Sequence, residues 1–174
     1  MNTTYDPQNI IFFDGEFSSL DPKNGELISV AFIKPNGEEL YLEINYKGAY
    51  SPWVKKNILP MLNSKKISVL TARRKIKKFV GNSQPYLVSF VNQFDVIFLH
   101  KFFGGPNKWP FHWIPIDFAS VLFAKGIDPE KISRNDQETF IEMGINPSHY
   151  KKHHALDDTR MLKEIYEKVM NYKK

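Results

Sequence analysis

The chain has 174 residues, 42% of them hydrophobic and 25% charged, which is typical of one globular domain and excludes a disordered chain. It contains no cysteine, so disulfides and thiolate metal sites are excluded. Residues 1–4 do not resemble a signal peptide, and no apolar run approaches the about 18 residues of a membrane-spanning helix. We therefore expect a single domain over residues 1–174, with a cytoplasmic location and no membrane partner.

The net charge of +5 is distributed unevenly along the chain. The segment from Ile44 to Phe94 contains no Asp or Glu, so all 19 acidic residues lie outside it. The same segment carries ten basic residues: Lys47, Lys55, Lys56, Lys65, Lys66, Arg73, Arg74, Lys75, Lys77 and Lys78. Although a charge run is usually a solvated face, fifty-one residues without an acid favour a polyanion-binding surface.

The first predicted element covers Ile10–Phe17 and ends in two carboxylates. Its four leading apolar residues predict a strand that is buried on both faces, at the centre of a sheet. Because side chains alternate along a strand, Asp14 and Glu16 should point to the same face, and we interpret Gly15 as open space between them. Two carboxylates on one face repel unless a cation lies between them, and hard oxygen ligands suit Mg²⁺ or Mn²⁺.

Two further strands and two helices are predicted in the first half of the chain. Leu27–Ile33 and Leu40–Ile44 should complete a three-strand meander with the first strand at the centre. A short helix should begin with Ser51 as its cap and Pro52 as its first residue. Residues 68–80 predict an amphipathic helix with a basic outer face. Its predicted inner residues are Val69, Leu70, Ile76, Phe79 and Val80.

The second half of the chain alternates between strands and helices. Strands are predicted over Pro85–Val91 and Ile114–Phe118, and helices from about residue 92 to Phe103, over Asn135–Met143 and over Ala155–Tyr172. Strands first, followed by strand–helix alternation, predict an α/β fold with a central mixed sheet flanked by helices.

Three groups of carboxylates lie next to these predicted elements. Asp14 and Glu16 end the first strand, Asp95 opens the middle helix, and Asp158 opens the last helix. His153 precedes Asp158 by five positions. An imidazole with a pKa near neutrality can accept a proton from water, which suits a general base.

In this order the three motifs resemble the DEDDh 3′–5′ exonuclease superfamily, which has a ribonuclease H-like fold. These motifs are Asp-x-Glu, Asn-x-Phe-Asp and His-x-Ala-x-x-Asp, and they span positions 14–158. The resemblance implies that His153 is the general base. It also implies four metal-binding carboxylates that hold two divalent cations, Mg²⁺ or Mn²⁺: Asp14, Glu16, Asp95 and Asp158.

A narrower resemblance links the chain to the polyadenylate-specific 3′–5′ exoribonuclease (ribonuclease AS) family. It rests on the short helix Ser-Pro-Trp-Val-Lys-Lys-Asn-Ile-Leu-Pro at 51–60, on Asp-Gly-Glu-Phe at 14–17, and on Phe103-Gly104. This resemblance implies a homodimer. The chain departs from the family at Gly15, where a hydroxyl residue is more usual, and at Asn92-Gln93, which leaves the substrate preference open.

The sequence thus predicts an exoribonuclease that shortens single-stranded RNA from its 3′ end and releases nucleoside 5′-monophosphates. Two alternatives remain open: DNA or short oligonucleotides as the substrate, and a non-catalytic nucleic-acid-binding module. Phe17 is expected to contact the terminal nucleotide, and Trp53 either stacks on a base or packs its own helix. We expect His154 at the surface or supporting the site, and Asp117 as a structural acid.

Overall fold

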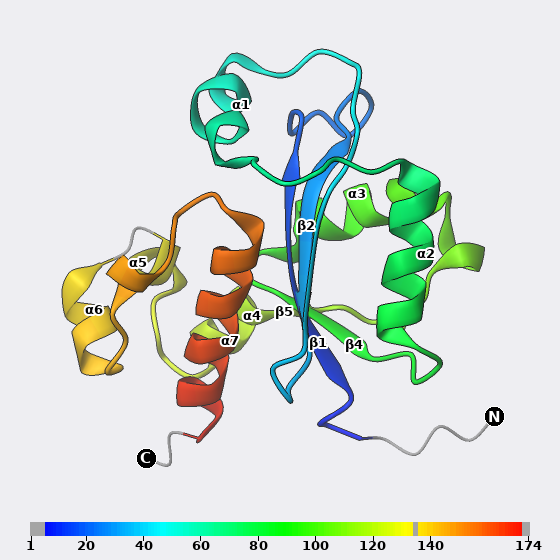
Figure 1. Ribbon diagram of the computed structural model, residues 1–174. Helices are drawn as coiled ribbons and strands as arrows, with labels where there is room; N and C mark the ends of the chain where they lie inside the picture. The colour runs from blue at the N-terminus through cyan, green and yellow to red at the C-terminus, as the bar shows by residue number, and fades with distance from the viewer. Residues whose placement is uncertain (1–5, 134–135, 172–174) are drawn as a thin grey trace.

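The computed structural model describes residues 6–133 and 136–171 and has a five-stranded sheet at its centre (Figure 1). The strands are β1 (Ile10–Phe17), β2 (Leu27–Ile33), β3 (Glu39–Glu43), β4 (Tyr86–Ser89) and β5 (Ile116–Asp117). They follow the order β3-β2-β1-β4-β5. β1 pairs antiparallel with β2 and parallel with β4. The predicted mixed sheet is confirmed, with the first strand at its centre.

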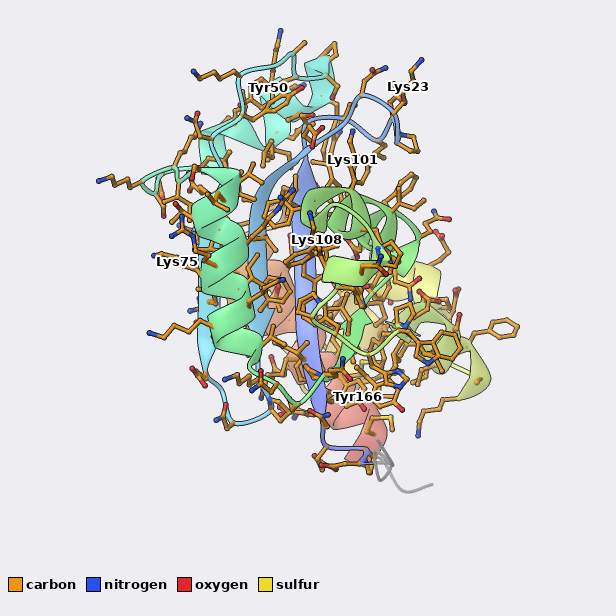
Figure 2. The ribbon with its side chains drawn as sticks, turned by 90° about the vertical axis from the view of Figure 1, so that its right-hand side faces the viewer. Lys23, Tyr50, Lys75, Lys101, Lys108 and Tyr166 are labelled. Carbon is orange, nitrogen blue, oxygen red and sulfur yellow. The ribbon has the colours of Figure 1, made fainter. Side chains whose placement is uncertain are left out.

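Helices cover both faces of this sheet. They are α1 (Pro52–Asn57), α2 (Val69–Val80), α3 (Asn92–Phe103), α4 (Phe118–Ala124), α5 (Pro129–Ser133), α6 (Gln137–Glu142) and α7 (Ala155–Asn171), with short 3₁₀ turns at Leu59–Met61, Pro106–Lys108 and Pro147–His149. α2 and α3 lie on one face and α7 on the other, as Figure 1 shows. In Figure 2, which looks onto α2 and α3, Lys75 lies on the outer side of α2.

Most predicted elements are found within a few residues of their expected bounds. Ser51 caps α1 by accepting a hydrogen bond from the Val54 amide, as expected. Gly104 ends α3 in the left-handed conformation, which glycine adopts without strain. The predicted strand at 114–118 contains only two strand residues because the chain turns at once into α4. Two predicted helix ends, Asn135 and Tyr172, lie outside the described residues.

The prediction that Val69 and Leu70 lie on the buried side of α2 was wrong. The buried residues are Ala72, Ile76 and Val80, each four positions apart. Leu70 precedes Ala72 by two residues, which puts it on the opposite side of the helix, and its side chain is 60% exposed. Val69 lies in the first turn of the helix and is 37% exposed.

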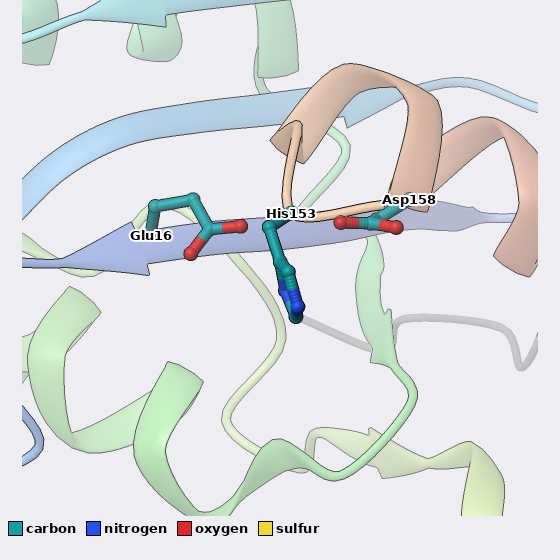
Figure 3. A group of neighbouring side chains, drawn as sticks. All are labelled: Glu16, His153 and Asp158. Carbon is teal, nitrogen blue, oxygen red and sulfur yellow. The ribbon is translucent and has the colours of Figure 1, made fainter. Parts of the chain in front are cut away.

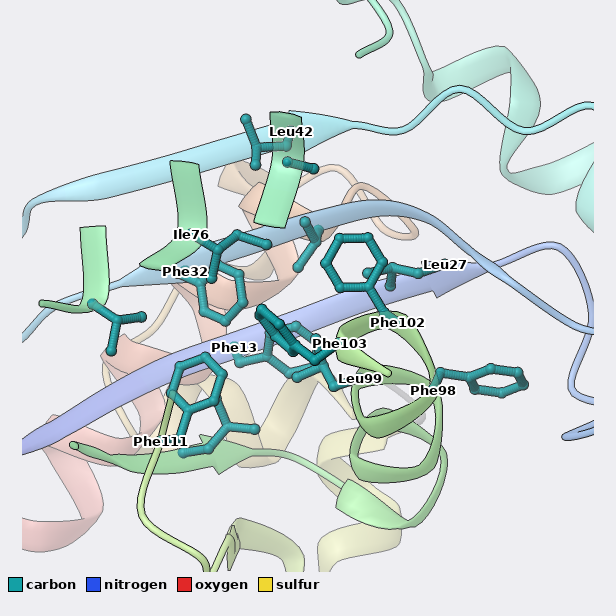
Figure 4. Close-up of a cluster of buried hydrophobic side chains, with 14 of the residues drawn as sticks. Phe13, Leu27, Phe32, Leu42, Ile76, Phe98, Leu99, Phe102, Phe103 and Phe111 are labelled. Carbon is teal, nitrogen blue, oxygen red and sulfur yellow. The ribbon is translucent and has the colours of Figure 1, made fainter. Parts of the chain in front are cut away.

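Two hydrophobic cores lie on the two sides of the sheet. Phe13 contributes to the core under α2 and α3, where its ring centroid lies 5.0 Å from that of Phe32 (Figure 4). Phe12 faces the other way, into the core under α4 to α7, where its ring meets Tyr166 edge-on at 5.1 Å. β1 is therefore buried on both faces over its apolar half. Within the described residues, none of the helices is long and apolar enough to cross a membrane.

Candidate active site

On the side of β1 that faces α7, the side chains change from apolar to acidic toward the end of the strand. Ile10 and Phe12 are buried in the second core, and the next two residues on that face are Asp14 and Glu16. Burial raises the pKa of Asp14 well above its usual range, and the charges of Asp158, Glu16 and Asp95 raise it further. Burial and the charges of Asp158 and Asp95 raise the pKa of Glu16 to about 8.

The first turn of α7 brings Asp158 to the same place (Figure 3). Ligand atoms of Glu16, His153 and Asp158 all lie within 4.8 Å of one another. Burial raises the pKa of Asp158 to about 7, although hydrogen bonds from the backbones of His153 and His154 act in the opposite direction. A strand end and a helix start, more than 140 positions apart in the sequence, thus form one group of ligands.

Asp95 comes from the first turn of α3 and is 7% exposed. Burial raises its pKa to about 7, with a further contribution from the charge of Asp117. Its charge in turn raises the pKa of both carboxylates on β1, so it belongs to the same electrostatic group. The four predicted metal carboxylates therefore interact electrostatically, and the group whose ligand atoms lie within 4.8 Å of one another comprises Glu16, Asp158 and His153.

These carboxylates fit the divalent cations that the sequence suggests. Burial and mutual repulsion disfavour their charged forms, and a bound cation would remove that penalty. Carboxylate oxygens are the ligands that Mg²⁺ and Mn²⁺ prefer. The donor set is thus the one expected of a Mg²⁺ or Mn²⁺ site.

His153 lies in the loop before α7 in an unusual backbone conformation. Its φ angle is 64°, in the left-handed region that residues with a side chain rarely adopt. Burial lowers the pKa of its imidazole, and the charge of Lys152 lowers it further. A lowered pKa favours the neutral ring, which is the form that can accept a proton. Strained backbone conformations of this kind cluster at active sites, where the surrounding structure holds them in place.

A cleft of about 660 Å³ opens beside the carboxylates and is bordered by Asp14, Glu16, Trp53, Phe94 and Asp95, among others. A smaller cavity of about 180 Å³ lies next to it and is bordered by His153, Asp158 and residues of α5 and α7. The two share Asp14 and Phe90. The carboxylate group is therefore accessible from a cleft large enough for a nucleotide-sized ligand.

The two expected substrate residues differ in what their side chains do. Trp53 is 53% exposed, borders the cleft and approaches the ring of His153 edge-on at 5.0 Å. Its neighbour Val54 is 4% exposed and belongs to the core cluster that holds α1, which does not include Trp53. Phe17 also borders the cleft, but it is 8% exposed and its ring stacks on Phe98 at 4.3 Å. Most of the Phe17 ring is thus part of the first core.

The interpretation of Gly15 as space between the carboxylates was wrong. Because side chains alternate, a side chain at position 15 points away from Asp14 and Glu16. A Cβ there would meet Leu27 and Phe13 of the first core at 3.0 Å. Gly15 thus leaves room for the core side chains behind it, and its backbone also borders the cleft.

His154 and Asp157 form a set of contacts that ties the loop of His153 to β3. The ring of His154 packs on Tyr41 at 4.9 Å, and its Nδ1 lies 3.5 Å from Asp157 Oδ2. Arg160 donates to Asp157 at 3.0 Å and to both carboxylate oxygens of Glu39. The expected supporting position of His154 agrees with these contacts.

Asp117 has structural hydrogen bonds, as expected. Its carboxylate accepts hydrogen bonds from the backbone of Asn92, at the start of α3, and of Ser120 in α4.

Several residues at the cleft were not anticipated from the sequence. Leu20 and Val91 border it and are 57% and 45% exposed, and Phe94 and Phe90 supply aromatic walls. Their signal in the sequence was weak, because apolar residues next to a strand or at a helix start are expected in a core. Lys152, at the smaller cavity, directly precedes His153.

Comparisons with known proteins agree with the fold. No protein-family model matches the chain, and a search of curated proteins finds no match. Among solved structures, an exonuclease I described as suggesting how processivity is achieved matches at a TM-score of 0.71 and 15% identity, over 94% of this chain and 41% of that one. Exonuclease I in its apo form matches at 0.67 and 14%, over 94% and 42%.

At these identities the likeness shows the fold alone, and the ribonuclease H-like fold is confirmed. The chain spans about two fifths of the length of the exonuclease I structures. The narrower resemblance to the ribonuclease AS family stays a prediction.

Proposed function

We propose that this chain is a single 3′–5′ exonuclease domain that depends on divalent metal ions and hydrolyses single-stranded RNA. The observation that carries the proposal is that Asp14, Glu16, Asp95, His153 and Asp158 surround two adjoining cavities that share Asp14. There the charges of Asp95 and Asp158 raise the pKa values of Asp14 and Glu16, next to an imidazole whose pKa is lowered. Buried carboxylates with strongly raised pKa values lower the stability of the metal-free protein, and such groups are expected at functional sites.

The carboxylates would hold two divalent ions, Mg²⁺ or Mn²⁺. When bound, such ions supply charge stabilisation to a phosphodiester undergoing attack by water and to its leaving 3′-oxygen. The fold-level likeness to exonuclease I supports the same assignment. By analogy, chain shortening would proceed from the 3′ end and release nucleoside 5′-monophosphates.

His153 would act as the general base. Its lowered pKa keeps the ring unprotonated at pH 7, so it can take the proton of the attacking water. The backbone bonds to Asp158 and the edge contact with Trp53 restrict where the ring can lie. A general base contributes about 10²- to 10⁴-fold to a rate, so His153→Ala should lose activity in that range.

Trp53 would provide a stacking surface for a base of the substrate. More than half of its side chain is free, and it lies on the cleft beside the general base. Stacking on an aromatic ring is worth about 1–3 kcal/mol per base and tolerates any sequence. Phe17 would contribute where it borders the cleft, through its backbone or ring edge.

RNA is proposed as the substrate because of the resemblance to the ribonuclease AS family, which also suggests a homodimer. Single-stranded DNA or short oligonucleotides are the alternative with the same chemistry. A non-catalytic binding module is disfavoured because every position of the motif has a competent residue.

The deciding experiment is digestion of 5′-labelled single-stranded RNA and DNA of the same sequence with Mg²⁺ or Mn²⁺. We expect ladders that shorten from the 3′ end, nucleoside 5′-monophosphates by mass, and no reaction in EDTA. His153→Asn should be strongly impaired. His149→Asn is the matched control, because His149 is exposed and bonds only to Asn146 among the described residues. Full activity in His153→Asn, or an internal cleavage pattern, would overturn the proposal.

A further inference from the structure

The uneven charge of the sequence becomes an unpaired basic surface in the structure. Nine of the ten basic residues between Ile44 and Phe94 are exposed: Lys47, Lys55, Lys56, Lys65, Lys66, Arg74, Lys75, Lys77 and Lys78. Arg73 is half-buried and donates to the carbonyl of Phe102. Within residues 6–133 and 136–171, none of these ten forms an ion pair with a carboxylate. By contrast, four basic residues elsewhere do: Lys34, Lys101, Arg160 and Lys163.

This surface starts at the cleft. Ser51, Trp53 and Val54 of the α1 region border the cleft, and Lys55 and Lys56 follow within the same helix. α1 is thus both a wall of the candidate active site and the first basic element beside it.

From α1 the basic residues continue around the end of the sheet. The chain passes Lys65 and Lys66 and then runs beside the end of β3, where the Asn45 amide donates to the Ile67 carbonyl at 2.8 Å. α2 follows on the face of the sheet opposite α7 (Figure 1). Its inner residues are apolar, while Arg74, Lys75, Lys77 and Lys78 are exposed, with Lys75 on the outer side in Figure 2. We name Lys55, Lys56, Lys65, Lys66 and these four residues of α2 the basic track.

The opposite flank of the site carries the other sign of charge. Five acidic residues lie from position 128 to position 142, against two basic ones: Asp128, Glu130, Asp136, Glu138 and Glu142, against Lys131 and Arg134. α5 within this segment provides Ile132 and Ser133 to the smaller cavity next to His153. Lys152 also borders this cavity, so a polyanion leaving on this flank would meet one basic residue beside the site and then a segment with more acids than bases.

We propose that the single strand upstream of the reacting 3′ nucleotide leaves the cleft over α1 and follows the basic track onto α2. This inference rests on the proposed function, because it takes the 3′ end to lie at the carboxylates. Unpaired Lys and Arg side chains bind phosphates without regard to base sequence. α2 alone is about 18 Å long, so only longer strands reach its residues, while short ones end at α1.

Binding of RNA of different lengths tests this path. Asp14→Asn serves as the background so that the strand is not consumed. Fluorescence anisotropy with labelled 4-mer and 20-mer RNA is measured over a series of salt concentrations. Lys55→Ala/Lys56→Ala should weaken both lengths. Arg74→Ala/Lys75→Ala should weaken the 20-mer alone and lower its salt slope by about 1.4, at about 0.7 for each lost phosphate contact.

The matched control is Lys125→Ala/Lys131→Ala, which removes two exposed charges near the acidic flank and should leave both affinities unchanged. The path is wrong if the α2 pair binds the 20-mer as the background does, or if the control pair weakens it equally. Shortening activity is measured separately, on protein that retains Asp14. Either of these binding results together with shortening activity refutes the track and spares the proposed function. Length-selective loss in the α2 pair, together with no shortening by the protein that retains Asp14, would support the track and refute the exonuclease assignment.

Discussion

The two faces of β1 differ in what they do for the fold. On the side of α2 and α3, Ile11, Phe13 and Phe17 remain apolar to the end of the strand and join one core. On the side of α7, the apolar residues give way to Asp14 and Glu16. One face therefore stabilises the protein along its whole length, whereas the other lowers stability at the end where we propose the cation site. Substitutions on the two faces should therefore differ in their effects on activity and on stability.

Asp14→Asn should have the largest effect, and its effects on activity and stability should be opposite in sign. Loss of a metal carboxylate removes several kcal/mol of charge stabilisation, so activity with Mg²⁺ should fall about 1000-fold or more. The metal-free protein should melt at a higher temperature, because a buried, repelled carboxylate has been replaced by a neutral amide. Steady-state rates and thermal melts in EDTA measure the two effects. A variant that is both inactive and less stable without metal would contradict this account of the face.

Phe13→Ala tests the other face and should act on stability alone. Phe13 is fully buried between Phe32 and the helices, so truncation should cost about 3–5 kcal/mol in the free energy of unfolding. Urea denaturation measures this loss. Ile97→Ala is a suitable control, because Ile97 is 45% exposed and should change stability by less than about 0.5 kcal/mol. The remaining folded fraction of Phe13→Ala should keep its Mg²⁺ dependence.

The stability of the metal-free protein should depend on pH because of the buried carboxylates at the site. The pKa values of Glu16, Asp95 and Asp158 rise from 4.5, 3.8 and 3.8 to about 8, 7 and 7. For an acid whose pKa is raised by folding, the unfolded state releases its proton first. The contribution of these groups is thus full below about pH 4 and is lost as the pH rises through 7 to 8.

We therefore expect the melting temperature in EDTA to be lower at pH 8.5 than at pH 5.5, and Mg²⁺ to reverse the loss at pH 8.5. The lowered pKa of His153 acts in the opposite direction below its usual value of 6.5, but one imidazole opposes four carboxylates. Asp14→Asn should show a shallower dependence. Equal melting temperatures at both pH values without metal would mean that burial and repulsion do not raise the pKa values of these carboxylates as described.

The sequence predicted the carboxylate face better than the helices that complete the site. Asp14, Glu16, Asp95, His153 and Asp158 could be grouped because their motifs are short and local, each on one predicted element. α4 and α5, with seven and five residues, were missed, because helices this short show little periodicity; α1 is equally short but was predicted from its Ser51 cap and Pro52. The exposure of Leu70 depends on where α2 crosses the sheet, which no local pattern encodes. The stacking of Phe17 on Phe98 likewise depends on tertiary packing.

Gly15→Ala should have the smallest effect, and it tests how independent the two faces are. The new methyl group would point into the first core, within 3.0 Å of side-chain ends of Leu27 and Phe13, which must give way by a few tenths of an ångström. The lower entropy of the unfolded chain offsets that cost, so the net change in stability should be within about 1 kcal/mol. Activity and Mg²⁺ affinity should be unchanged, because the methyl group lies on the far side of the strand from Asp14 and Glu16. A tenfold loss of activity with unchanged stability would show that the backbone at position 15 contacts the substrate directly, since this residue also borders the cleft.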